Sequence, residues 1–221
     1  MMLKEHDFIE HLRQTLAADL RHDTFFDEQS RLVLTQDMLI EKTHFNLVTT
    51  SPEDLGWKAI AVNLSDLAAT AAKPLWITVG LACPSSTQSD WIKRLYTGMQ
   101  ACCDAYGCQI VGGDTTRGDI VCISVSATGK VPQNQAVGRR TGAEAGHVIA
   151  IAGWHGQIAV GLHTLTHNLV NNYPEAVSQH RQPHPMLPLA EKLACAVTTN
   201  EITMMDTSDG LADALMQLSK V

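Results

Sequence analysis

Seven residues at positions 112–118 combine features that suit phosphate and metal chemistry. They read Gly-Gly-Asp-Thr-Thr-Arg-Gly and follow the apolar stretch 108–111, which predicts a short strand. Glycines let a backbone turn sharply and approach a ligand closely. Arg117 suits phosphate oxygens, and Asp114 suits a divalent cation. Because Gly-Gly-Asp is also an ordinary turn, these residues alone leave both interpretations open.

Acidic residues of the same kind recur elsewhere in the chain. Asp37 directly follows a predicted strand. Asn63 and Asp66 are three residues apart and therefore share one face of a helix that is otherwise nearly all apolar. A carboxylate in such surroundings is costly unless it is paired or binds a cation. The alternative is a helix whose single polar stripe faces solvent.

A last acidic motif lies at 206–209 and reads Asp-Thr-Ser-Asp. Asp206 ends a predicted short strand, and Ser208 and Asp209 have the side chains that cap helices. A cap and a phosphate or metal site often coincide at a helix N-terminus, so both roles are compatible. We expect five carboxylates to converge on one cleft: Asp37, Asp66, Asp114, Asp206 and Asp209.

Composition excludes several classes of function. The net charge of -7 argues against nucleic acid as the main partner, because a phosphate backbone needs basic patches. No stretch approaches the roughly 20 apolar residues of a membrane helix, and no signal peptide is recognisable, which predicts a cytoplasmic protein. The six cysteines form no Cys-x-x-Cys pair and are expected to be reduced and mostly buried.

Hydrophobic periodicity predicts alternating helices and strands, hence an α/β or α+β fold. Phe8, Ile9, Leu12 and Leu16 indicate a first helix. Further helices are expected at 52–72, 90–106, 157–171, 188–199 and from about 209. Strands are expected at 31–35, 75–83, 108–111, 120–130, 147–152 and 202–206.

The stretch 131–146 is rich in Gly, Gln and Arg and predicts a domain boundary. We expect an N-terminal domain at 1–135 and a C-terminal domain at 146–221. The second would have only about 75 residues and too few strands for a stable sheet. The C-terminal domain is therefore expected to be incomplete.

The four motifs together resemble those of the thiamine-monophosphate kinase family, within the aminoimidazole ribonucleotide synthetase-like superfamily. The matching residues are Thr-Gln-Asp at 35–37 with His-Phe at 44–45, Asn-Leu-Ser-Asp-Leu-Ala-Ala at 63–69, and the motifs at 112–118 and 206–211. The resemblance implies a two-domain fold whose N-terminal domain dimerises through its sheet. It also implies ATP- and Mg²⁺-dependent phosphorylation of thiamine monophosphate to thiamine diphosphate.

The resemblance also implies roles for individual residues. The metal ligands would be Asp23, Thr35, Asp37, Asp66, Asp114, Asp206 and Asp209. ATP would contact Tyr96, Gly113, Asp114, Arg140 and Ser208. His44 would contact the phosphate of thiamine monophosphate; without the resemblance, a partly buried structural histidine would be the preferred interpretation.

The sequence departs from the family pattern in two places. The family carries Gly-Asp-Asp-Ala-Ala-Val before its first strand, whereas residues 20–26 read Leu-Arg-His-Asp-Thr-Phe-Phe, so that large Phe25 and Phe26 replace small residues. The family's Gly-Gly-Glu-Asp-Tyr-Glu motif has no counterpart before Val221. An alternative function is therefore a catalytically impaired relative that keeps the dimeric scaffold and nucleotide binding.

Overall fold

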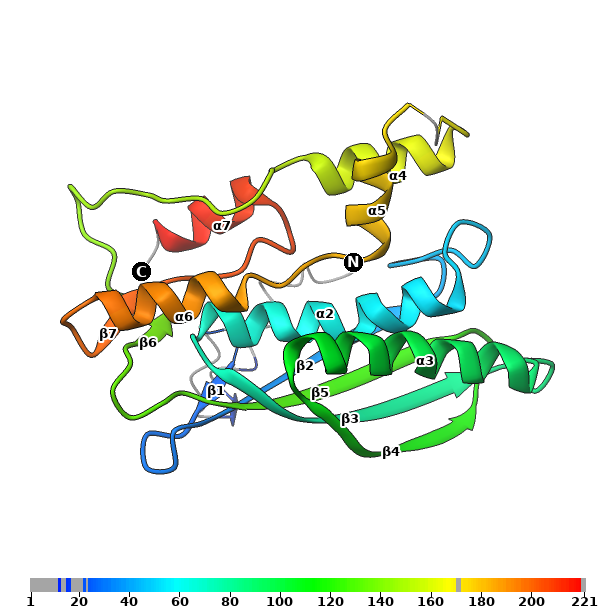
Figure 1. Cartoon of the computed structure of the whole chain (residues 1–221), viewed down its shortest axis with the longest axis horizontal. Coiled ribbons are helices and arrows are strands. Elements are labelled where there is room, and N and C mark those ends of the chain that lie inside the picture. Colours follow the sequence, from blue (N-terminus) through cyan, green and yellow to red (C-terminus); the bar gives the residue numbers. More distant parts are fainter. Residues whose placement is uncertain (1–11, 13–14, 17–21, 23, 170–171, 220–221) are drawn as a thin grey trace.

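The computed structural model describes residues 12, 15–16, 22, 24–169 and 172–219. Its centre is a mixed five-stranded sheet in the order β1-β2-β5-β3-β4, with helices α2 and α3 across one face (Figure 1). The strands are β1 (Phe25–Phe26), β2 (Leu32–Ile40), β3 (Lys73–Cys83), β4 (Gln109–Arg117) and β5 (Cys122–Lys130). The two covering helices are α2 (Pro52–Ala69) and α3 (Ser89–Tyr106).

Beyond this sheet, the described residues form four more helices and a second, smaller sheet. A two-stranded parallel sheet pairs β6 (Val137–Arg139) with β7 (Glu201–Thr203). The remaining helices are α4 (Gln157–Thr166), α5 (Pro174–Arg181), α6 (Leu187–Ala196) and α7 (Leu211–Leu218). No helix within the described ranges has both the length and the apolar content that crossing a membrane requires.

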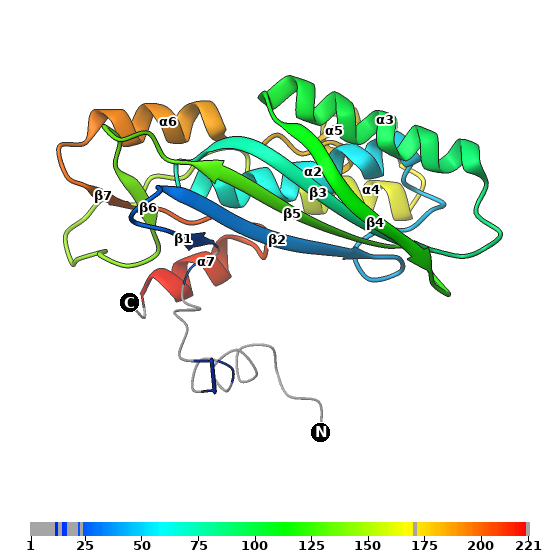
Figure 2. The same cartoon turned by 90° about the horizontal axis from the view of Figure 1, so that it is seen from below.

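The two faces of the sheet differ in burial. On β5 the side chains of Ile123, Val125 and Ala127 point toward the helices and are buried, as strand alternation requires. The opposite face, turned toward the viewer in Figure 2, exposes apolar side chains such as Met38 and Trp76, each 48% accessible. We call this second surface the outer sheet face.

Helices α2 and α3 approach each other unusually closely because glycines lie at their contact. A Cβ added at Gly56 would lie 2.0 Å from the carbonyl oxygen of Leu95. One added at Gly98 would lie 1.9 Å from that of Glu53. Arg94 also donates two hydrogen bonds, of 2.6 and 2.9 Å, to the Glu53 carboxylate. The pair therefore packs backbone against backbone and forms a firm support behind the sheet.

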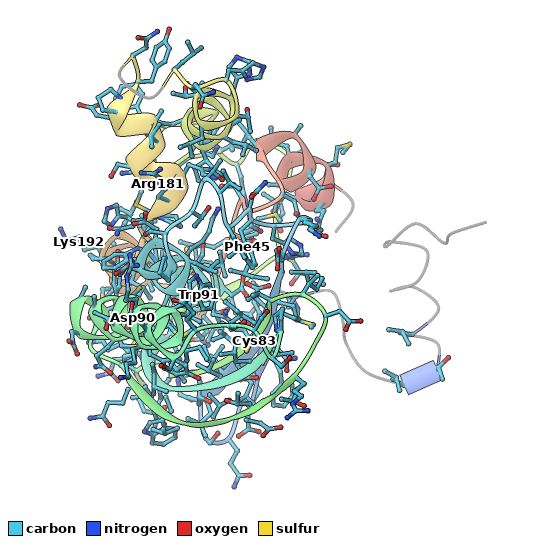
Figure 3. The ribbon with its side chains drawn as sticks, turned by 90° about the vertical axis from the view of Figure 1, so that its right-hand side faces the viewer. Phe45, Cys83, Asp90, Trp91, Arg181 and Lys192 are labelled. Atoms are coloured by element: carbon cyan, nitrogen blue, oxygen red, sulfur yellow. The ribbon has the colours of Figure 1, made fainter. Side chains whose placement is uncertain are left out.

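Helix α5 packs over the N-terminal half of α2, and Figure 3 shows its Arg181 just above the helical layer. The Arg181 guanidinium donates a 3.2 Å hydrogen bond to the carbonyl of Thr49. Its neighbour Gln182 donates to Asp54 of α2 at 2.7 Å. His180 is buried beside these groups and its Nδ1 has no hydrogen-bond partner.

His180 should make stability depend on pH. Burial, followed by the positive charges of Lys58 and Arg181, lowers the pKa of His180 from 6.5 to about 4, with a backbone hydrogen bond opposing the shift. The folded state therefore holds His180 neutral, and stability is lost as pH falls from about 6.5 toward 4. We expect His180→Gln to reduce the fall in melting temperature across this window. Equal slopes for variant and wild type would contradict this assignment.

Most of the expected elements of the N-terminal half are confirmed. The helices at 52–69 and 89–106 and the strands at 73–83 and 122–130 match closely, and Gly107 ends α3 in the left-handed conformation (φ 74°). The helix expected from Phe8 to Leu16 lies largely outside the described residues. The motif at 112–118 is not a turn, because β4 continues through it to Arg117.

The C-terminal half holds the clearest errors of prediction. Residues 147–152 were expected to form a buried strand, but they form no strand, and Val148 is 91% exposed. A strand needs a neighbour for its backbone hydrogen bonds, and no described strand lies beside this segment. Helix α5 was not predicted. Neither Ser208 nor Asp209 caps α7, whose N-cap is Gly210 without a side-chain hydrogen bond.

Candidate metal and nucleotide site

Asp66 is the most buried carboxylate of the candidate site. It lies on the sheet-facing side of α2, 8% exposed, because the surrounding Leu64, Leu67 and Ala68 commit this helix to the core. The hydroxyl of Thr35, on β2, donates a 2.5 Å hydrogen bond to Asp66 Oδ2. The contact joins two residues 31 positions apart and fixes the carboxylate against the sheet.

Asp37 follows Thr35 on the same face of β2. Its backbone N–H donates a 3.1 Å hydrogen bond to Asn63 Oδ1, while Asn63 donates to the carbonyl of Ala59 at 3.1 Å. Asn63 is fully buried and so links β2 to α2 beside the two acids. Sequence reasoning noted that Asn63 and Asp66 share a helix face but did not include Asn63 in the site.

Four carboxylates form one electrostatic group. Burial raises the pKa of Asp37, and the charges of Asp206 and Asp209 raise it further, while His44 lowers it. Burial raises the pKa of Asp66 to about 8, with added repulsion from Asp37 and Asp206, although the Thr35 hydrogen bond opposes the shift. Such a group is short of positive charge and would be stabilised by a cation.

Arg140 supplies positive charge at one side of this group. Its Nη1 donates a 2.5 Å hydrogen bond to Gln217 of α7. Burial lowers the pKa of Arg140, whereas the nearby charges of Asp206, Asp213 and Asp209 raise it. An arginine held among three aspartates at the edge of an acidic group is well placed to contact phosphate oxygens.

His44 lies in the turn after β2 and is exposed. The backbone N–H of Ile40 donates a 2.9 Å hydrogen bond to His44 Nδ1, so the neutral ring carries its proton on Nε2. That orientation leaves Nε2 as a donor, which suits a phosphate oxygen. His44 also lies near enough to Asp37 to lower the pKa of that carboxyl group, which places it at the border of the acidic group.

Asp114 does not join the other four carboxylates within one chain. Asp37 pairs with Val125, Val125 with Val79, and Val79 with Gly113, so three strand spacings separate β2 from β4. At about 4.8 Å a spacing, this is roughly 14 Å. Asp114 pairs with Gly80 and is exposed at the edge of the sheet. The expected convergence of five carboxylates is therefore wrong for Asp114.

The other candidate residues are more scattered. Tyr96 lies on α3 with its ring packed against the main core, and Ser208 is exposed between β7 and α7. Asp23 lies outside the described residues. Phe26 is buried, and the guanidinium groups of Arg31 and Arg139 lie 5.5 and 4.9 Å from its ring centre. It therefore belongs to the core.

The donors fit a hard cation. Across the described residues, no three His, Cys, Asp or Glu side chains are close enough to hold a metal ion by themselves. Mg²⁺ usually keeps several waters and binds through one or two carboxylates together with substrate phosphates. Carboxylates that repel one another, beside an arginine and an exposed histidine, match that arrangement better than a closed all-protein cage.

Residues 18–131, more than half of the chain, match the family model described as AIR synthase related protein, N-terminal domain. The chain belongs to this family. Within it, the thiamine-monophosphate kinase of Synechococcus elongatus is 38% identical over 196 residues, covering 86% of this chain and 60% of that protein. That of Prochlorococcus marinus is 35% identical over 206 residues, covering 87% and 61%. The resemblance to thiamine-monophosphate kinases is thus confirmed.

A solved structure shows the same relationship. The structure described as AaThiL complexed with AMPPCP and TMP has a TM-score of 0.91 and 28% sequence identity. The match covers all of this chain and 72% of that chain. The chain spans about 60% of the length of the two curated relatives. The α/β fold expected from the sequence is confirmed.

Proposed function

We propose that this chain carries the ATP- and Mg²⁺-binding part of a kinase that phosphorylates thiamine monophosphate to thiamine diphosphate. The observation that carries the proposal is the group formed by Asp37, Asp66, Asp206 and Asp209, in which burial and mutual repulsion raise the pKa of Asp66 to about 8. The relatives named thiamine-monophosphate kinase support the substrate. The ThiL complex with AMPPCP and TMP supports the nucleotide.

The proposed chemistry is direct transfer of a phosphoryl group between two phosphates. Such a transfer depends mainly on positioning and on neutralising charge. Bound Mg²⁺ would supply most of the neutralising charge, held by Asp37, Asp66, Asp206 and Asp209 with Thr35 at their edge. The remaining assigned residues act on phosphate or nucleotide: Arg140, Ser208, Gly113 and Tyr96 toward ATP, and His44 toward thiamine monophosphate.

The position of Asp114 leads us to propose a site shared between two copies of the chain. Across the sheet, Met38 pairs with Ser124, Ser124 with Gly80, and Gly80 with Asp114. The side chain of Asp114 is therefore on the outer sheet face, as that of Met38 is. If Asp114 binds the same cation group, it must come from a second protomer. The homodimer expected from the sequence would pack through this outer face. With a domain division near 136–145, that contact would lie entirely within residues 1–135.

The cytoplasmic location stays a prediction.

The function is tested by titrating the chain with Mg²⁺ and a non-hydrolysable ATP analogue in a calorimeter, alongside an assay for thiamine diphosphate. We expect Asp114→Asn to lower metal-dependent affinity for the analogue at least tenfold, because asparagine keeps the size and loses the charge. Asp119→Asn, an exposed change five residues later, is the matched control. Tight Mg²⁺-dependent binding without turnover would favour the nucleotide-binding scaffold, and no binding at all would contradict the proposed site.

The proposed dimer is tested separately by light scattering at tens of micromolar. We expect a dimer for the wild type and a monomer for Met38→Lys, because the added charge on the outer sheet face would be buried in the dimer without a partner. Thr97→Lys, on the exposed side of α3, should leave the dimer intact. A monomeric wild type would argue against the shared site.

A further inference from the structure

Three cysteines meet where α3 ends and β4 begins, away from the acidic group. Cys102 and Cys103 lie in the last turns of α3 and are fully buried, and Cys108, immediately before β4, is 4% exposed. All three are free thiols. The proposed function uses none of them.

The backbone brings two of these cysteines together. Gly107 adopts the left-handed conformation, with φ 74° and ψ 34°, and turns the chain back on the helix. The backbone N–H of Cys108 then donates a 3.0 Å hydrogen bond to the carbonyl of Cys103, five residues earlier. In this type of helix ending, the side chains at these two positions regularly contact each other. Here both side chains carry sulfur.

The pKa values of these two thiols shift in opposite directions. The interaction between the two thiols raises the pKa of Cys103 and lowers that of Cys108. Burial, with added repulsion from Cys108, raises the pKa of the third thiol, Cys102, to about 12. Cys108 is therefore the group of the three that most readily becomes a thiolate, the reactive form of cysteine.

The buried sulfurs lie beneath a turn that is itself exposed to solvent. The turn above them is open, because Asp104, Ala105 and Gly107 are exposed and a Cβ added at Gly107 would meet nothing within 4 Å. An oxidant as small as hydrogen peroxide needs this turn to open before it reaches Cys108, which is 4% exposed. A bulky disulfide reagent would need the last turn of α3 to unwind.

We propose that Cys103 and Cys108 form a peroxide-sensitive dithiol that closes to a disulfide without rearrangement of the fold. The Cys108 thiolate attacks one oxygen of hydrogen peroxide, which forms a sulfenic acid and releases hydroxide. The sulfur of Cys103 then attacks the sulfur of Cys108, and the S–O bond breaks with release of water as the Cys103 proton is lost. Two thiols are oxidised, one peroxide is reduced, and a thiol reductant reverses the change.

The Cys103–Cys108 disulfide would link the last turn of α3 covalently to the residue that precedes β4. The bond closes a ring of six residues whose backbone ends already share a hydrogen bond, so the fold should tolerate it. Because β4 carries Gly113 and Asp114 further along, the cross-link would restrict the strand from which the proposed shared site takes a ligand.

The test treats the native chain with hydrogen peroxide, removes the oxidant, unfolds the chain in denaturant that contains N-ethylmaleimide so that buried thiols are also blocked, and then digests it. Chymotrypsin cleavage after Tyr106 separates Cys103 from Cys108, so their two peptides stay joined only if a disulfide links them. We expect joined peptides in the wild type and in Cys102→Ala, separate peptides in Cys103→Ala and Cys108→Ala, and separation by dithiothreitol in every case.

The exposed Cys195 reports that the oxidant was active, because it should be oxidised in all variants. Loss of the joined peptides in Cys102→Ala would show that the bond involves Cys102 and would overturn the assignment. Oxidised Cys195 with both Cys103 and Cys108 still alkylated would overturn it as well. The readout is a peptide mass, so it is independent of nucleotide binding and of the proposed kinase activity.

Discussion

Asp66→Asn should make the metal-free protein more stable at pH 8 while removing its Mg²⁺-dependent binding of nucleotide. The pKa of Asp66 is raised from 3.8 to about 8, so the folded state binds a proton that the unfolded state releases. In the wild type without metal, stability is therefore lost as pH rises from about 4 to 8. Asparagine resembles the protonated carboxyl group and removes this loss.

We expect the free energy of unfolding to rise by about 2 kcal/mol at pH 8. The full pKa shift would correspond to a larger gain, since each pKa unit is worth about 1.4 kcal/mol. Relaxation of the site when Asp66 ionises reduces the gain. Urea unfolding at pH 5 and pH 8, with and without Mg²⁺, measures it. Asp119→Asn serves as the control. A variant that is less stable than the wild type at pH 8, or one that still binds Mg²⁺ and the ATP analogue normally, would contradict the assignment of Asp66.

The second large effect is expected at Gly113. A Cβ at this position would lie 1.9 Å from the carbonyl oxygen of Val79 on the neighbouring strand, and backbone cannot move aside as a side chain can. Gly113→Ala should therefore separate β4 from β3 and cost about 3 kcal/mol, a magnitude typical of severe steric conflict in a packed region. Urea unfolding measures this loss directly.

Gly112→Ala is a matched control one residue away, since a Cβ there would meet nothing within 4 Å. It should change stability by less than about 0.5 kcal/mol. Similar losses for the two variants would contradict the assignment of the Gly113 effect to the close approach of β4 to β3. The comparison thus tests the structural role of Gly113.

The elements most readily predicted were those whose signals are local. Pro52 and the acids after it start α2, Gly107 ends α3, and alternation of buried side chains identifies β5. The segment 147–152 has an equally apolar sequence but no strand beside it, so its composition alone was misleading. A strand forms only when a second segment supplies its hydrogen-bond partners. The sequence of one segment does not show whether such a partner is present.

The candidate site was predicted in part for the same reason. Motif positions identified Asp37 and Asp66, and the structure brings Asp37 near Asp206 and Asp209, and Asp66 near Asp37 and Asp206. The separation of Asp114 depends on strand order, because β5 and β3 lie between β2 and β4. Strand order is set by long-range pairing that no local motif reports.

That strand order also constrains how the polypeptide can fold as it leaves the ribosome. Strand β5 pairs with β2 along Leu32–Ile40 and with β3 from Lys73 to Ala82, yet it comes after both in the chain. Until Lys130 has emerged, β2 and β3 have no strand between them, and β3 presents an unpaired edge to the cell. Non-local pairing of this kind is slow and leaves apolar surface open to other chains. A growing chain that stops short of β5 should therefore require a chaperone, whereas one that includes it can complete the sheet in a single insertion.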